Sequence, residues 1–298
     1  MRPSLAAAAV VAVAVLAAGA AAAPALATST FPAAVKAVAP PQGDQDFLQS
    51  AVDSPDRSAQ NKARDRWRHP AESLTFWGIR PGDVVIELDP GGGYWAEVLA
   101  PFARDTAGRY IGALPDPRDP KDNDEQKRNR DRFMARFGDE ARWGKVETAS
   151  FGQTSGPLAA PGSVDFILTG RNIHNFMWRG QLDKVLSDAF AALRPGGVLA
   201  VEEHRADPRP MIPEARDGYV SEAYVIAAAR KAGFEFGGRS EINANPKDSK
   251  DHPFGVWTLP PTRASSPPGQ PPNPSFDHAR YDAIGESDCL TLRFVKPG

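Results

Sequence analysis

A run of three glycines directly follows a short, apolar segment that is rich in β-branched residues. Residues 84–88 read Val-Val-Ile-Glu-Leu, and residues 89–93 read Asp-Pro-Gly-Gly-Gly. Glycines let a backbone approach a ligand closely, and the amphipathic helix predicted at 95–102 would point its partly positive N-terminus at an anionic group. The spacing therefore predicts a loop that holds a nucleotide cofactor.

A second group of polar residues follows two later predicted strands. His174 comes shortly after the strand expected at 164–168, and Glu203 and His204 come directly after the strand expected at 198–202. Because ligands of open parallel sheets bind beyond the carboxyl ends of the strands, we expect these side chains at the same edge as the glycines. A neutral imidazole can take a proton from a hydroxyl group. We expect His174 to be the general base, with Glu203 or His204 orienting it or contacting substrate.

Structural roles are the alternative for these side chains. His174 could cap the next helix or lie satisfied in the core, and Glu203 or His204 could belong to an ion pair with Arg171 or Arg205. A metal site would need ligands from this set, to which Glu202 and His252 would add. None of them shows the close i, i+4 or H-x-H spacing that is typical of metal ligands, so we expect no metal.

A second motif decides between the cofactors that the glycine loop would fit. Residues 91–96, Gly-Gly-Gly-Tyr-Trp-Ala, fit the G-x-G-x-x-A loop of dinucleotide enzymes as well as the E/D-x-G-x-G-x-G loop of methyltransferases. Downstream, the segment 193–197, Leu-Arg-Pro-Gly-Gly, resembles the L-x-P-G-G segment before the fifth strand of class I S-adenosylmethionine-dependent methyltransferases. The resemblance covers roughly residues 70 to 295 and is nearest to a group of exported methyltransferase-like proteins.

The resemblance implies S-adenosyl-L-methionine as the cofactor. Gly91 and Gly93 would let the backbone approach its methionyl part, and the helix N-terminus would favour its carboxylate. The chain departs from the family pattern twice: Asp89 stands where the first glycine is usual, and Leu114 replaces the acidic residue that usually holds the ribose, with Asp116 two positions later. The expected cofactor contacts are Glu87, Asp89, Gly91, Gly92, Gly93, Tyr94, Asp116 and Asn172.

Predicted strands and helices alternate along most of the chain. Strands are expected at 84–88, 109–114, 145–149, 164–168 and 198–202, and helices at 95–102, 182–193 and 219–232. This pattern predicts an α/β, doubly wound fold with a mainly parallel, seven-stranded sheet. The alternating run at 289–295 follows without a strong helix before it, so we expect it to be an antiparallel edge strand.

The N-terminus has the composition of a secretory signal peptide. Arg2 precedes a run of Ala, Val and Leu, and Ala25-Leu26-Ala27 is a small-x-small cleavage pattern. We expect residues 1–27 to be removed, which leaves an exported, periplasmic or secreted protein without stable membrane insertion; an uncleaved anchor is the alternative. Residues 28–64 are expected to be an exposed arm, and 65–298 the methyltransferase-like domain with a Pro-rich surface insertion at about 259–280.

Composition limits the classes of molecule that we expect the protein to bind. A net charge of −2 and the absence of a long basic block disfavour nucleic acid, so a small-molecule substrate is expected. Cys289 is the only cysteine and cannot form an internal disulfide. The sequence thus favours methyl transfer to a small-molecule nucleophile such as a hydroxyl. The alternatives are an exported binding protein that has kept the fold but lost the cofactor, and a nicotinamide-dependent oxidoreductase.

Overall fold

The computed structural model describes residues 42–211 and 214–298. The expected signal peptide and residues 28–41 of the expected arm lie outside this part of the chain. No helix within it is both long enough and apolar enough to cross a membrane.

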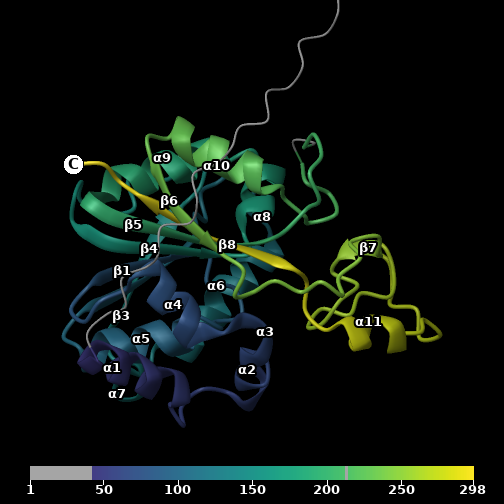
Figure 1. Cartoon of the computed structure of the whole chain (residues 1–298), viewed down its shortest axis with the longest axis horizontal. Coiled ribbons are helices and arrows are strands. Elements are labelled where there is room, and N and C mark those ends of the chain that lie inside the picture. Colours follow the sequence, from purple (N-terminus) through teal and green to yellow (C-terminus); the bar gives the residue numbers. More distant parts are fainter. Residues whose placement is uncertain (1–41, 212–213) are drawn as a thin grey trace, which may run out of the picture. The chain divides into compact units, whose positions relative to one another are not determined.

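Seven strands form one mixed sheet in the order β3-β2-β1-β4-β5-β8-β6 (Figure 1). They are β1 (Val84–Leu88), β2 (Arg109–Pro115), β3 (Val146–Phe151), β4 (Val164–Gly170), β5 (Leu193–His204), β6 (Glu235–Ser240) and β8 (Cys289–Val295). The first five strands pair in parallel, and β8 pairs antiparallel with both β5 and β6. The predicted α/β, doubly wound sheet is confirmed, and its antiparallel strand lies one position in from the edge strand β6.

Helices cover both faces of the sheet because its central strands are apolar on both sides. Val85 and Phe166 face one apolar layer, and their neighbours Ile86 and Ile167 face the other. The first layer contains residues of α1 (Gln42–Asp53), α4 (Pro70–Trp77), α5 (Ala96–Asp105), α6 (Asp124–Phe137) and α7 (Glu140–Trp143). The second contains residues of α8 (Ile173–Trp178), α9 (Leu182–Ala192) and α10 (Glu222–Lys231).

The structure corrects the expectation of an exposed arm for residues 42–64. Residues 42–53 form α1, which packs against α5 and buries Leu48, Ala51 and Val52. These three positions have i, i+3, i+4 spacing and therefore share one face of the helix. Two short helices follow, α2 (Ala59–Lys62) and α3 (Asp65–Arg68). The described part of the arm thus belongs to the folded domain.

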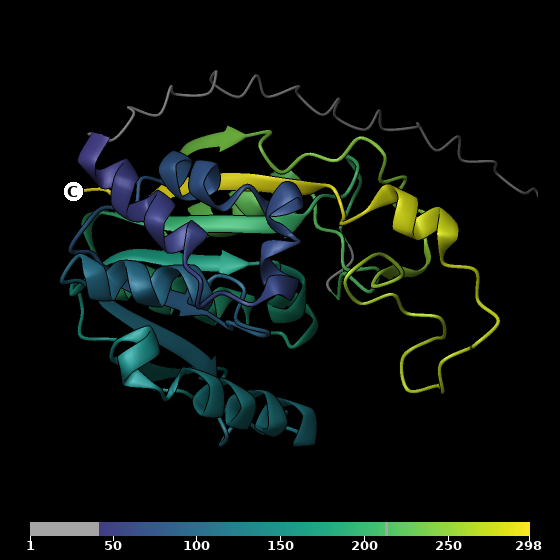
Figure 2. The same cartoon turned by 90° about the horizontal axis from the view of Figure 1, so that it is seen from below.

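Residues 241–288 leave the sheet after β6 and return to it at β8 (Figure 2). This segment contains the short strand β7 (Pro253–Val256) and α11 (Ala279–Ile284). Residues 266–277, within the expected Pro-rich insertion, are mostly exposed. The backbone N–H of Val256 donates to the Asp217 carbonyl, which ties the segment to the chain that follows β5.

Candidate functional site

The glycine loop lies at the carboxyl end of β1, and its three glycines differ in their surroundings. Gly91 and Gly93 have left-handed φ values of 52° and 77°, which glycine adopts readily. A Cβ on Gly93 would lie 2.7 Å from the Phe137 ring, whereas a Cβ on Gly92 would meet nothing within 4 Å. Gly91 and Gly92 are exposed and Gly93 is buried. The open tip of the loop is therefore formed by Gly91 and Gly92.

The loop presents donors that no protein group uses. Within the described chain, the backbone N–H groups of Gly91 and Gly92 donate to no protein acceptor, and α5 begins at Ala96. The loop carbonyls are held instead: Arg136 donates to the Gly92 oxygen at 2.8 Å and the Asn172 amide to the Asp89 oxygen at 2.9 Å. Free amides next to a helix N-terminus favour an anionic group.

Asp89 has the backbone conformation that a glycine would have at this position. Its φ is 52°, a region that Asp tolerates better than most residues. Burial raises the pKa of its carboxyl group, and the Arg179 guanidinium, whose Nη1 lies 3.5 Å from Oδ2, opposes that rise. Arg179, which the sequence did not single out, thus offsets the negative charge that Asp89 brings to the loop.

Two expected cofactor contacts are engaged with other side chains. The hydroxyl of Tyr110 donates to Glu87 at 2.6 Å on the face covered by α5, and burial raises the pKa of Glu87 to about 8. Asp116 follows β2 and pairs with Arg118 at 3.0 Å, and this guanidinium lowers the pKa of Asp116. Both carboxyl groups therefore have partners within the protein.

Tyr94, the residue that follows the three glycines, also has partners within the protein. Its hydroxyl donates to Asp65 at 2.7 Å, and its ring lies beneath arginine side chains from the N-terminal helices. This places the N-terminal helices directly beside the glycine loop.

The structure brings the three predicted catalytic side chains together. Glu203 leaves β5 on the face that α8 covers, because residues 201 and 203 point to the same side of a strand. Its Oε1 lies 2.9 Å from Nδ1 of His174, its Oε2 accepts the His174 backbone N–H at 3.0 Å, and Oε1 also accepts the His204 N–H at 2.7 Å. The two imidazole rings are 5.3 Å apart.

His204 is held differently from His174. Its Nδ1 lies 2.5 Å from the Ser287 hydroxyl oxygen. Burial, and after it the positive charge of Arg171, lowers the pKa of His204 well below its ordinary value. His204 is therefore neutral near pH 7 and is suited to shaping the site around His174.

These three residues also satisfy the loose distances of a metal site. One ligand atom from each lies within 4.8 Å of the others. However, the Glu203 oxygens already accept three N–H groups if His174 carries its proton on Nδ1, and the Arg171 charge acts on His204. A carboxylate that orients an imidazole fits these contacts better than a ligand to a cation.

The structure corrects the ion pairs that the sequence considered. Arg171 pairs with Glu202 at 2.9 Å and with Glu286, and Arg205 pairs with Glu241 at 2.7 Å, so neither guanidinium binds Glu203. Sequence reasoning missed Glu286 and the N-terminal arginines that join this network, because they come from segments far apart in the chain.

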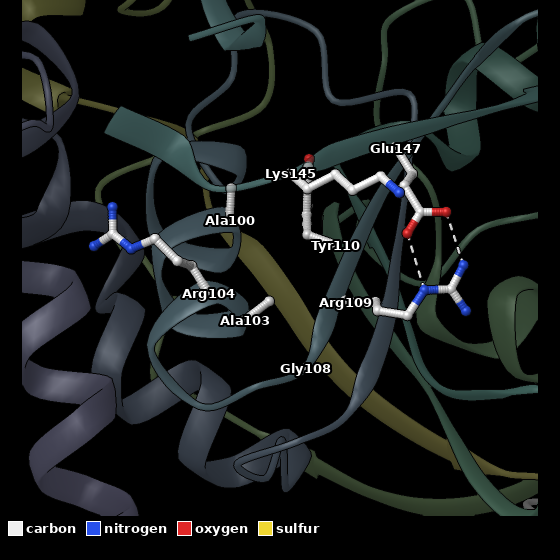
Figure 3. A pocket seen from close by; sticks show the side chains of 8 residues that line it. All are labelled: Ala100, Ala103, Arg104, Gly108, Arg109, Tyr110, Lys145 and Glu147. Atoms are coloured by element: carbon white, nitrogen blue, oxygen red, sulfur yellow. Dashed lines mark hydrogen bonds and ion pairs between the residues drawn. The ribbon is translucent and has the colours of Figure 1, made fainter. Parts of the chain in front are cut away.

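Two surface pockets lie away from this site. One, of about 310 Å³, is formed by α5 and the amino-terminal ends of β2 and β3 (Figure 3). Two of the residues that line it, Arg109 and Glu147, form an ion pair at 2.7 Å. The other, of about 320 Å³, shares both residues. Both therefore lie at the opposite end of the strands from the glycine loop and His174.

Comparisons with known proteins find similar solved structures but no related sequence family. No protein-family model and no curated protein matches the sequence. Among solved structures, a SAM-dependent methyltransferase from Aquifex aeolicus is 18% identical, covers 67% of this chain and 93% of its own, and has a TM-score of 0.46. The [4+2]-cyclase SpnF is 16% identical over 84% of this chain and 92% of its own, with a TM-score of 0.49. An arsenic(III) S-adenosylmethionine methyltransferase from Chlamydomonas reinhardtii is 15% identical over 85% and 73%, with a TM-score of 0.46. At these values the similarity concerns the chain path and says nothing about chemistry.

Proposed function

We propose that this protein transfers a methyl group from S-adenosyl-L-methionine to a hydroxyl group of a small molecule. One observation carries the proposal: a glycine loop with free amides ends β1, and a His174–Glu203 pair lies at the ends of β4 and β5. Because β1 and β4 are neighbours in the sheet, the two features share one edge.

The loop residues fit such a cofactor. The N–H groups of Gly91 and Gly92 would receive its carboxylate, and the open space at Gly92 leaves room for it. When bound, S-adenosylmethionine supplies an electrophilic methyl group on a sulfonium centre. The loop and the turn at Asn172 would align donor and acceptor, which is most of what methyl transfer requires.

His174 would remove the acceptor's proton. With its Nδ1–H donated to Glu203, its Nε2 is left as the proton acceptor. S-adenosylmethionine would supply the methyl group that replaces the hydroxyl proton on the acceptor oxygen, and that proton would pass to Nε2. The products are the methyl ether and S-adenosylhomocysteine, and Glu203 stabilises the imidazolium that forms.

Two departures from the family pattern favour a second candidate function, that of a binding protein that has lost the cofactor. Asp89 places a carboxyl group beside the loop, and Leu114 is a buried apolar residue at the end of β2. A carboxylate at Asp89 would repel the carboxylate of the cofactor, and the Leu114 side chain has no atom that could accept a hydrogen bond from a ribose hydroxyl.

Isothermal titration calorimetry distinguishes the candidates. Saturable binding of S-adenosylmethionine and S-adenosylhomocysteine without binding of NADH is expected. No heat of binding for any of the three ligands would favour the cofactor-free binding protein. Binding of NADH alone would favour an oxidoreductase. Turnover is then followed by mass spectrometry of a hydroxyl-compound library incubated with methyl-labelled cofactor.

A further inference from the structure

Three arginines and two glutamates form a buried cluster at the carboxyl edge of the sheet. The Arg68 Nη2 atom lies 2.6 Å from Glu202, and Arg171 lies 2.9 Å from the other oxygen of the same carboxylate. Arg64 lies 2.6 Å from Glu286, which also pairs with Arg171. This network, the arginine cluster, joins α3, the end of β4, β5 and the segment before β8.

The arginine cluster has more positive than negative charge. Three guanidinium groups stand against two carboxylates, and the neighbouring Arg57–Asp65 pair adds none. Glu203 does not compensate, because it leaves β5 on the other face and accepts the donors of His174 and His204. Glu87, which interacts with Arg68, does not compensate fully either, because burial raises its pKa to about 8. A buried excess charge is costly unless a counter-charge binds beside it.

Two buried N–H groups in the cluster have no partner. They are Nη2 of Arg171, whose side chain is 9% exposed, and Nε of Arg68, whose side chain is 5% exposed. The cluster reaches solvent at Arg64, whose side chain is 19% exposed. Unpaired guanidinium donors beside an excess positive charge are the arrangement that recognises a carboxylate.

The cluster lies beside the glycine loop and includes the turn that precedes His174. Two of its three guanidinium groups stand over the ring of Tyr94, with Arg68 at 4.1 Å and Arg64 at 5.2 Å from the ring centre. Arg171 has a left-handed φ of 62° in the turn that leads into α8 and His174. A methyl acceptor must reach both the cofactor loop and the base, and the cluster borders the loop at Tyr94 and precedes His174 in the chain at Arg171.

We propose that the arginine cluster binds a carboxylate group of the methyl acceptor, so that the substrates are hydroxylated organic acids. The inference rests on the proposed function. An incoming carboxylate would use the free Arg171 and Arg68 donors and neutralise the excess charge, while the acceptor's hydroxyl group faces His174.

The test measures carboxylate binding apart from catalysis. Thermal unfolding of the protein saturated with S-adenosylhomocysteine is followed at constant ionic strength while acetate, lactate, acetamide or chloride is added. The two carboxylates are expected to raise the melting temperature in a saturable way, and acetamide and chloride are not. An equal effect of chloride, or no effect of either carboxylate, overturns the proposal.

Charge variants sharpen the result. Glu286→Gln removes one negative charge and should strengthen acetate binding by at least about threefold, since a nearby unit charge contributes more than that. Arg171→Lys keeps the positive charge but removes the planar guanidinium donors, and should therefore weaken acetate binding. Arg104→Gln, at an exposed ion pair with Asp105, is the matched control and should change nothing. Unchanged acetate affinity in Glu286→Gln sinks the proposal even if Arg171→Lys does not fold. Calorimetry with S-adenosylhomocysteine separately shows whether the cofactor site itself has failed.

Discussion

His174 is fixed by one carboxylate at two points, the ring and the backbone. Glu203 binds both Nδ1 and the backbone N–H of this residue, so the imidazole cannot rotate without breaking a buried hydrogen bond. A carboxylate on Nδ1 also fixes the tautomer, which leaves Nε2 as a proton acceptor. This is the geometry of a prepared base, and it gives the first prediction.

Replacing His174 by Ala should lower turnover about 10²- to 10⁴-fold while S-adenosylhomocysteine binding stays intact. Single-turnover kinetics and calorimetry check both points. Glu203→Gln, which keeps a hydrogen-bond acceptor for Nδ1, should retain part of the rate. Full activity of His174→Ala would make the histidine structural.

The buried carboxyl group of Glu87 should make stability depend on pH. Burial raises its pKa from 4.5 to about 8. The folded state therefore holds this proton more tightly than the unfolded state, and the stabilisation is complete below about pH 4.5 and lost as the pH rises through 8. Urea unfolding between pH 5 and 9 should show a loss of at most about 5 kcal/mol that Glu87→Gln lacks. Parallel pH profiles for the two proteins would contradict this.

At the scale of elements, the glycine loop contains one glycine with a structural role, Gly93, and one that is accessible, Gly92. Gly93 combines a φ of 77° with the close Phe137 ring, whereas Gly92 has neither constraint. Gly92→Val should therefore leave urea unfolding unchanged and abolish S-adenosylhomocysteine binding. Gly93→Val, its matched partner, should destabilise the fold by about 1–3 kcal/mol or more through strain and overpacking. Normal cofactor affinity in folded Gly92→Val would place the ligand elsewhere.

Helix α1 supplies a second test at this scale. Leu48 is 3% exposed and packs in the layer that contains α5, whereas its neighbour Phe47 is 47% exposed. Leu48→Ala should lower the free energy of unfolding by about 2–5 kcal/mol. Phe47→Ala should change it by less than about 0.5 kcal/mol. Equal, small effects of both substitutions in urea unfolding would mean that α1 contributes little to the domain.

Local patterns predicted most elements, but not the contacts between distant ones. Strand β1 has the expected bounds, Val84–Leu88, whereas β5 begins at Leu193, before the glycine pair that was expected to precede it. The position of His174, Glu203 and His204 at one edge followed from strand order. The arginine cluster could not be predicted in this way. Arg64 and Glu286 are 222 positions apart, and sequence periodicity does not predict contacts between such distant residues.

At the scale of the whole molecule, the N-terminus gives a prediction of its own. The Ala-rich run and Ala25-Leu26-Ala27 predict that the exported protein begins near Thr28. Intact mass spectrometry of protein recovered from the native host should show that N-terminus, and Ala27→Arg should block processing. An unprocessed Met1 on protein in the cytosol would contradict both export and cleavage.

The position of β8 has a consequence for how the chain acquires its structure during synthesis. The last strand of the sheet in chain order lies between β5 and β6 and not at the margin. It also binds the N-terminal half, because Trp77 donates to the Leu292 carbonyl at 3.0 Å and Arg293 donates back to the Trp77 carbonyl at 3.1 Å. Until residues 289–295 have left the ribosome, β5 and β6 each have an open edge, and such edges invite pairing with other chains. The sheet of the nascent protein therefore stays incomplete until the chain has been synthesised past residue 295.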